Sequence, residues 1–467
     1  MLRKASRRPL VVAELPQRSV ILLPQPAAKR PGFVMQVFPK PAATVLLVAL
    51  IANLLARGIV PAMSVVGSDF PSYFTAARIV ADGGDARRLY DIPWFQEQMR
   101  RYQIGKPSAG KFSPFPPPTA LLLVPLARLS PLDALRVVTA VSLLCLIASI
   151  LLLARILAWR ALDAALLVLL SGWATVSALR LGQPYILVAA SCILGYYAYL
   201  KDRPWLAGAS LGVFTPLKYF PVVILAYFGL RRRWQVLAGG ALTIALVSGL
   251  SIAVLGWQIH VQFLGSVLGR HLVGNLSLQD PFTASFQSFD SLFRRLLVFD
   301  STANPQPWYA APSLHSGVVL VTKTIILLVA LATLIRLARL RDAAATAPSI
   351  GLLGLATLLL APATAPYHLV LLWLPVGLLA DFLLRERALA CGYFLLGGYA
   401  LIGFFPYRFT APFDGRGGLT VLAYPRLFLL LSMFIACVCC LWRRAGTPKG
   451  TDAPPARQIT VTEHDAP

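Results

Sequence analysis

Charged residues are scarce in this sequence. They make up 13% of the 467 positions, against about 25% in a typical soluble domain. A soluble chain with 57% hydrophobic residues could not cover its own surface with polar side chains. The composition therefore excludes an ordinary soluble protein and predicts a membrane protein, in which apolar runs of roughly 20 residues recur. The clearest runs are 42–60, 132–157, 236–256, 316–337, 388–405 and 419–441.

Acidic residues are scarcer still, with 19 Asp and Glu against 43 Lys and Arg. In a soluble protein the net charge of +24 would suggest nucleic acid as a partner. Here the basic residues cluster at the ends of apolar runs, a pattern that marks cytoplasmic loops. We therefore expect a lipid bilayer and no nucleic acid, both termini in the cytoplasm, and an even number of spans, which we predict to be about twelve. The basic clusters are 3–40, 155–160, 201–203, 231–233, 336–341, 385–387 and 443–449.

The sequence has only six cysteines, all inside or at the edge of apolar runs. This placement predicts no disulfide framework. The cysteines are interpreted as small membrane-core residues, with palmitoylation of Cys439 or Cys440 as the alternative. The sequence also lacks a Walker-type glycine loop, the two cysteine pairs that a zinc site needs and a histidine spacing typical of a metal motif. No cofactor and no metal are expected.

The chain divides into two tails and one membrane domain. Residues 1–40 and 443–467 are basic or Pro-rich without a spanning run, so we expect disordered cytoplasmic tails. The transmembrane domain is predicted over 41–442. Within it, long segments over 61–131 and 257–314 are predicted to be outside loops.

Two features of the membrane domain differ from simple spans. Apolar residues recur at helical spacing over 70–81, and a second apolar stretch over 119–129 is too short to cross a bilayer, so both are predicted to be helices along the membrane surface. The apolar stretches 205–214 and 219–230 are also too short, which predicts a broken hairpin around 215–218. Irregular backbone at membrane depth is tolerated only when it is buried or lines a water-filled cavity.

Three residues are candidates for chemistry. Asp69 follows the first span and is interpreted either as a general base or as the N-cap of the next helix. Lys218 lies in the predicted break, where a lysine is costly and either neutralises a phosphate or reaches for the interface. His368, at the outer end of a predicted span, suits proton shuttling or phosphate binding, with a structural role as the alternative.

Further candidates lie in predicted outside segments. Arg180 and Gln183 belong to the turn between two spans, and Arg294 lies in the second outside loop. Arginine suits bidentate contact with phosphate. The alternative for these arginines is anchoring at the membrane interface.

An ordered set of short motifs gives the sequence a resemblance to a known family. The motifs are Leu89-Tyr90, Phe115-Pro116-Pro117-Pro118, Pro125-Leu126-Ala127, Leu181-Gly182-Gln183, Ala207-Gly208, Leu211-Gly212, Leu217-Lys218 with Pro221, and the basic turn ending at Trp234. Together they resemble glycosyltransferase family 87. The resemblance covers roughly residues 45–442. Members include polyprenol-phosphate-mannose-dependent mannosyltransferases with the C-type glycosyltransferase membrane fold.

The resemblance implies an all-α polytopic membrane fold and a hexosyltransferase activity. The enzyme would move a hexose, with mannose the best-known case, from a polyprenyl-phosphate donor to a hydroxyl of a glycolipid or envelope glycan. Transfer would proceed with inversion on the outer, periplasmic face of a bacterial inner membrane, without a metal.

By position, the resemblance implies roles for the candidate residues. Asp69 would be the catalytic base, with His368 assisting. Lys218 and Arg180, together with Gln183 and Arg294, would bind the donor phosphate. Two alternatives remain, a transporter or flippase of lipid-linked sugars and a non-catalytic scaffold. The absence of a visible internal repeat in the sequence argues against the common transporter architectures.

Overall fold

The computed structural model describes residues 40–272, 281–339 and 342–446. Every element in this part of the chain is helical, which confirms the expected all-α class. The predicted tails lie outside the described residues, apart from Lys40 and the last turn of the final helix.

Six helical segments within the described residues are long and apolar enough to cross a membrane. The first combines α2 (Lys40–Leu54), a π-helical turn η1 (Leu55–Ile59) and α3 (Val60–Ser64). The others are α6 (Pro131–Leu157), α12 (Trp234–Leu255), α16 (Pro312–Leu337), η7 (Pro366–Leu372) with α18 (Trp373–Arg385), and α20 (Pro425–Gly446). Five of them match predicted apolar runs to within a few residues at most ends. The sixth, Pro366–Arg385, was not among those runs, and the run 388–405 instead forms the helix Leu389–Phe404.

Two bent helix pairs raise the number of candidate spans to eight at most in the described residues. One pair is α7 (Ala161–Leu169) with α8 (Trp173–Arg180), bent by 72°, and the other joins α19 (Leu389–Phe404) to a short turn over Tyr407–Phe413 at 77°. The prediction of about twelve spans is therefore not confirmed. Its additional spans correspond to shorter apolar helices, namely α9 (Tyr185–Leu200), α10 (Pro204–Phe214), α11 (Phe220–Leu230) and the 345–360 part of α17 (Asp342–Leu360).

Local backbone chemistry explains two breaks in the helices. The apolar stretch 162–179, which is counted as one of the twelve predicted spans, is interrupted at Gly172, whose φ of +51° favours glycine. A Cβ there would lie 2.4 Å from the carbonyl oxygen of Gly403, so α19 approaches closely at this point. The predicted break around 215–218 is confirmed, because α10 ends at Phe214 and α11 begins at Phe220.

The first outside segment is partly as predicted. The helix over 70–81 forms as α4 (Phe70–Ala81), but it is buried on most sides instead of lying along a surface. The expected helix over 119–129 is replaced by two 3₁₀ turns, η4 (Pro117–Leu121) and η5 (Val124–Leu126). Pro117 and Pro118 open η4, and Pro125 is the second residue of η5. Prolines lack the N–H that a longer α-helix needs.

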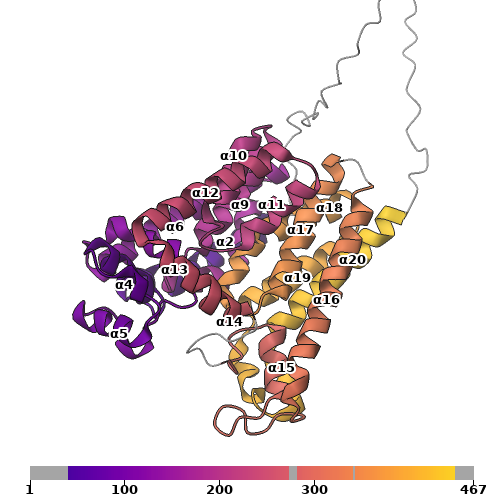
Figure 1. The fold of residues 1–467 in the computed structure, drawn as a ribbon. Helices are drawn as coiled ribbons and strands as arrows, with labels where there is room; N and C mark the ends of the chain where they lie inside the picture. The colour runs from indigo at the N-terminus through magenta and orange to yellow at the C-terminus, as the bar shows by residue number, and fades with distance from the viewer. Residues whose placement is uncertain (1–39, 273–280, 340–341, 447–467) are drawn as a thin grey trace, which may run out of the picture.

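The short elements gather at one end of the bundle, as Figure 1 shows. They include α4, α5 (Ile92–Arg101), α13 (Trp257–Gln262), α14 (Gly269–Leu272) and α15 (Phe289–Leu297). The chain enters α2 and leaves α20 at the opposite end. The minor 3₁₀ and π turns are η2 (Ala86–Arg88), η3 (Pro107–Ala109), η6 (Phe263–Leu268), η8 (Tyr407–Phe409), η9 (Ala411–Phe413) and η10 (Gly417–Ala423).

Candidate active site

A cavity of about 550 Å³ lies at the end of the bundle that carries α4 and α14. Loops form its polar part: the residues just before α4, the segment 109–116, the break at 217–219 and the turn 361–368. Helices α11, α16 and α17 supply most of its apolar wall. The break in the helices therefore does face a cavity, as irregular backbone at membrane depth requires.

Asp69 lines this cavity and occupies the N-cap position of α4 without a side-chain capping hydrogen bond. Its carboxylate instead accepts hydrogen bonds from Gln183 Nε2 (2.7 Å) and from Ser68 Oγ (3.3 Å). Burial raises the pKa of Asp69 above its ordinary value, although both hydrogen bonds oppose this shift. The side chain is thus directed at the cavity and not at the helix terminus.

Gln183 does not line the cavity but holds Asp69 from behind. Its amide is buried, and its Oε1 accepts a hydrogen bond of 2.8 Å from the Tyr73 hydroxyl. This contact fixes the orientation of the amide, so that Nε2 points at the carboxylate. The turn can approach because position 67 is glycine: a Cβ there would lie 2.1 Å from the carbonyl oxygen of Arg180.

Lys218 lines the cavity inside a cage of aromatic rings. Its Nζ lies 4.9 Å from the ring centroids of both Phe115 and Tyr185, and 5.7 Å from that of Tyr73. It also donates a hydrogen bond of 3.3 Å to the Tyr73 hydroxyl. Cation–π contacts hold an ammonium in place without neutralising its charge, so Lys218 presents a positive charge to the cavity.

His368 lines the same cavity from η7. Its Nδ1 accepts a hydrogen bond of 3.1 Å from the backbone N–H of Ala365, and its ring centroid lies 4.6 Å from that of Tyr185. In a neutral imidazole an accepting Nδ1 places the proton on Nε2. His368 can therefore donate a hydrogen bond through Nε2.

Two predicted arginines lie away from the cavity. Arg180 is exposed at the end of α8, with its guanidinium 5.8 Å from the centroid of the Trp173 ring. Arg294 lies half-buried on α15 and does not line the cavity. The structure thus brings Asp69, Lys218 and His368 together, places Gln183 behind Asp69, and leaves both arginines outside.

The sequence analysis missed two basic residues of the cavity, Lys111 and His271. Lys111 is partly buried beside Asp69, and burial lowers its pKa to about 8. The signal for Lys111 was available, because it lies among aromatic and proline residues just as Lys218 does. His271 stands on α14 with no sequence pattern that would single it out.

The remaining wall of the cavity is apolar. It includes Val222 and Val223 of α11, Leu327 and Leu331 of α16, and Leu353 of α17. Leu327 and Leu331 remain 45% and 39% exposed, so protein does not seal this side of the cavity. A ligand with a charged head and a hydrocarbon chain would match this distribution of polar and apolar surface.

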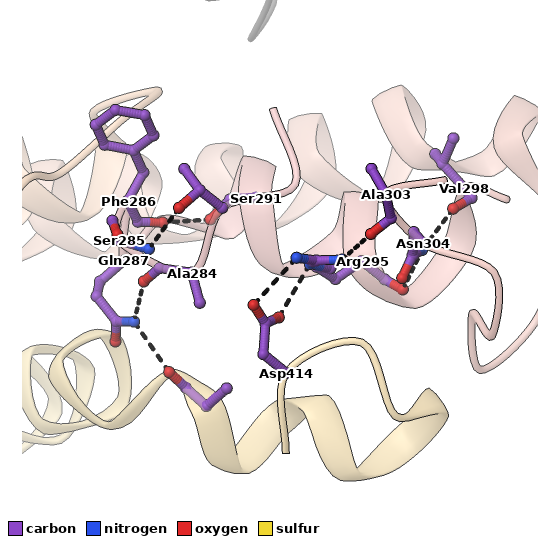
Figure 2. A network of polar contacts seen from close by, with 12 residues as sticks. Ala284, Ser285, Phe286, Gln287, Ser291, Arg295, Val298, Ala303, Asn304 and Asp414 are labelled. Atoms are coloured by element: carbon purple, nitrogen blue, oxygen red, sulfur yellow. Dashed lines mark hydrogen bonds and ion pairs between the residues drawn. The ribbon is translucent and has the colours of Figure 1, made fainter. Parts of the chain in front are cut away.

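A polar network supports the turn that leads to His368. The backbone N–H of Gln287 donates to the Thr364 carbonyl (3.1 Å), and Ser288 Oγ donates to the Pro362 carbonyl (2.8 Å). Gln287 also donates through Nε2 to the carbonyl of Ala423 (3.0 Å) and to that of Ala284 (2.6 Å), and Figure 2 shows the contact with Ala284. Further along α15, Arg295 pairs with Asp414 at 2.9 Å, which ties α15 to the segment before α20.

A known protein family matches the central part of the chain. The family model described as glycosyltransferase family 87 matches residues 114–362, which is more than half of the chain. The chain belongs to glycosyltransferase family 87. No curated protein and no solved structure matches it.

The family assignment makes the chain a glycosyltransferase, and its apolar helices place it in a membrane. The matched region contains Gln183, Lys218 and Arg294, whereas Asp69 and His368 lie outside it. The roles of these residues therefore depend on the geometry of the cavity.

Proposed function

We propose that this glycosyltransferase moves a hexose, mannose in the first instance, from a polyprenyl-phosphate donor to the hydroxyl of a glycolipid or envelope glycan. The observation that carries the proposal is the division of one cavity into two parts. A carboxylate and two amines, those of Asp69, Lys111 and Lys218, line its polar part, and helices α11, α16 and α17 form an apolar wall beside them. A sugar attached to a lipid phosphate is divided in the same way, into a polar, charged head and an apolar chain.

Asp69 is the base in this proposal. It takes the proton from the acceptor hydroxyl while the hydroxyl oxygen attacks the anomeric carbon. The bond from that carbon to the phosphate oxygen breaks, and the polyprenyl phosphate leaves with the bonding electrons. A single displacement of this kind inverts the anomeric configuration. Because burial raises the pKa of Asp69, the carboxylate is a stronger base than an exposed aspartate.

The two lysines offset the charge of the leaving phosphate. Lys218 is held in its aromatic cage, and Lys111 lies on a different polar segment of the cavity, 109–116. Fixed positive charges aimed at a developing anion stabilise the transition state. His368 Nε2–H donates to the phosphate or to the acceptor. We assign the donor phosphate to the lysines in preference to Arg180 and Arg294, because neither arginine lines the cavity.

The arrangement of the chain supports a cavity on the periplasmic face of a bacterial inner membrane. The described chain enters α2 and leaves α20 at one end of the bundle, and the cavity lies at the other. If the basic regions next to these ends are cytoplasmic, as the distribution of Lys and Arg indicates, the cavity faces outward. The donor would then reach it through the unsealed side formed by α16.

A transfer assay tests this proposal. Purified protein is incubated with radiolabelled polyprenyl-phosphate mannose and a lipid extract from the native host. We expect a labelled glycolipid whose formation falls by at least about 100-fold in Asp69→Asn, the range for loss of a general base. Asp82→Asn is the matched control, because Asp82 is an exposed carboxylate at the other end of α4.

Equal activity of Asp69→Asn and wild type would remove Asp69 from the mechanism. A second arm uses sealed vesicles with the labelled donor in one leaflet. Movement of the donor across the bilayer, without formation of any glycoside, would favour the flippase.

A further inference from the structure

The first membrane span carries an arginine at an irregular turn. Arg57 lies in η1, a π-helical turn inside an otherwise α-helical span. Such π-bulges occur often at functional sites, because the inserted residue changes the direction of neighbouring side chains. The Arg57 side chain is exposed on the bundle, seven residues before the end of α3. At about 1.5 Å per residue, it lies roughly 10 Å from that end of the span.

Arg57 and Arg180 converge on one tryptophan. Their guanidinium carbons lie 5.2 Å and 5.8 Å from the centroid of the Trp173 ring. The two carbons are therefore no more than about 11 Å apart. An indole attracts a cation without neutralising it, so the two like charges still repel each other.

No carboxylate pairs with either guanidinium within residues 40–272, 281–339 and 342–446. The ion pairs that the described residues form involve other basic side chains. Charged side chains at membrane depth are rare and normally have a partner or reach the interface. A missing partner at an exposed site therefore points to an anion supplied by the surroundings.

Close backbone packing holds the two arginines in position. A Cβ at Gly58, next to Arg57, would lie 3.5 Å from the Cα of Val176 on α8. The loop after α3 touches the other arginine directly, at the Arg180 carbonyl. The first span and α8 therefore pack closely, and this packing fixes the backbone positions from which the two arginine side chains extend.

We propose that Arg57 and Arg180, stacked on Trp173, bind the phosphate of an anionic bilayer lipid. The site lies outside the catalytic cavity, which neither arginine nor Trp173 lines. Guanidinium groups bind phosphate oxygens in pairs and are weakly hydrated, which suits the headgroup region of a bilayer. The single negative charge of the bound phosphodiester would reduce the repulsion between the two guanidinium groups and fix α8, whose last residue precedes the turn that carries Gln183.

Native mass spectrometry of the purified protein tests this proposal. The protein is exchanged into mixed micelles that contain phosphatidylglycerol or phosphatidylcholine, and retained lipid is counted. We expect preferential retention of phosphatidylglycerol. Its occupancy should fall roughly tenfold in the double variant Arg57→Gln with Arg180→Gln, as expected for two basic contacts to an anionic headgroup.

A charge-matched control separates this site from general attraction. Arg101→Gln with Arg128→Gln removes two exposed arginines, one at the end of α5 and one just before α6, and its lipid retention should equal that of wild type. Equal losses in both double variants would mean that only net charge matters and would overturn the proposal. The same result would follow if wild type retained both lipids equally.

A third arm distinguishes the source of the phosphate. The same proteins are offered polyprenyl phosphate without sugar. If the Arg57 and Arg180 substitutions lower retention of polyprenyl phosphate and leave phosphatidylglycerol unchanged, the arginines serve the donor, and the proposed bilayer-lipid site is wrong.

Discussion

The side-chain amide of Gln183 donates a 2.7 Å hydrogen bond to the carboxylate of Asp69, across 114 positions of the chain. The same amide accepts a hydrogen bond from the Tyr73 hydroxyl, whose oxygen in turn accepts one from the ammonium of Lys218. One chain of contacts therefore connects the proposed base with a proposed phosphate-binding lysine. A substitution at Gln183 should therefore change the orientation and the pKa of Asp69, although the carboxylate itself remains in place.

Gln183→Ala should lower kcat by about 10- to 100-fold, because the carboxylate loses the contact that orients it. It should also change the pH profile. The hydrogen bond from Gln183 lowers the pKa of Asp69, so its removal raises that pKa and moves the acidic limb of kcat to higher pH. Gln98→Ala on α5 is the control. An unchanged acidic limb would show that Gln183 does not act through Asp69.

The wild-type enzyme should lose activity at a less acidic pH than an exposed aspartate would predict. Burial raises the pKa of Asp69 above its ordinary value, and only the deprotonated carboxylate is a base. The rate therefore falls as the pH decreases through the raised pKa of Asp69, and it reaches its full value above that pKa. Measurement of kcat/KM between about pH 4 and 9 reports this group in the free enzyme. A profile that stays flat down to pH 4 would contradict the assignment.

The amine of Lys111 should give the pH profile of kcat/KM an alkaline limb. Burial lowers its pKa to about 8, so above this pH the amine loses the charge that offsets the donor phosphate. We expect kcat/KM to fall as pH rises through about 8. In Lys111→Arg the limb should move to higher pH, because arginine stays charged. If the limb stays in place in this variant, another group causes it.

Lys218→Met should weaken binding of the donor. Loss of a hydrogen bond to a charged group costs about 1.5–3 kcal/mol, or roughly 10- to 100-fold in affinity. Binding of a non-transferable donor analogue is the measurement, since it separates affinity from chemistry. Lys106→Met removes an exposed lysine of the same outer segment and should bind normally. Equal affinity of Lys218→Met and wild type would place the donor phosphate elsewhere.

Gly172→Ala should destabilise the bend between α7 and α8. Alanine is strained at a φ of +51°, and its Cβ would lie 2.4 Å from the Gly403 carbonyl oxygen. A cost of about 1–3 kcal/mol is expected for such a conformation alone. The apparent unfolding temperature in detergent should fall, whereas Gly249→Ala on α12, where a Cβ would meet no atom within 4 Å, should change little.

The sequence predicted the parts of the site that depend on local chemistry. Asp69 and Lys218 stood out because a carboxylate and an amine next to apolar runs are unusual, and His368 was singled out at a helix end; all three line the cavity. The orienting role of Gln183 was not visible, because it requires a partner 114 positions away. Lys111 carried the same signal as Lys218 but was not selected.

The number of spans also depends partly on local sequence and partly on tertiary packing. Apolar runs of bilayer length determine five of the six long segments, since burial in lipid depends on composition and length. The path of shorter helices such as α10 and α11 relative to the membrane does not follow from their own residues. Neighbouring helices decide whether a short helix crosses, bends or returns.

Composition and hydropathy were sufficient to predict a helical membrane protein with a carboxylate and a lysine at candidate positions. Hydropathy and the cost of charge in lipid act on each segment separately, and they can be evaluated residue by residue. Which polar residues share one cavity, and which lie outside it as Arg180 does, became visible in the folded chain. Those contacts depend on the packing of segments distant in the sequence, such as α4 against the turn before α9, and no local pattern encodes that packing.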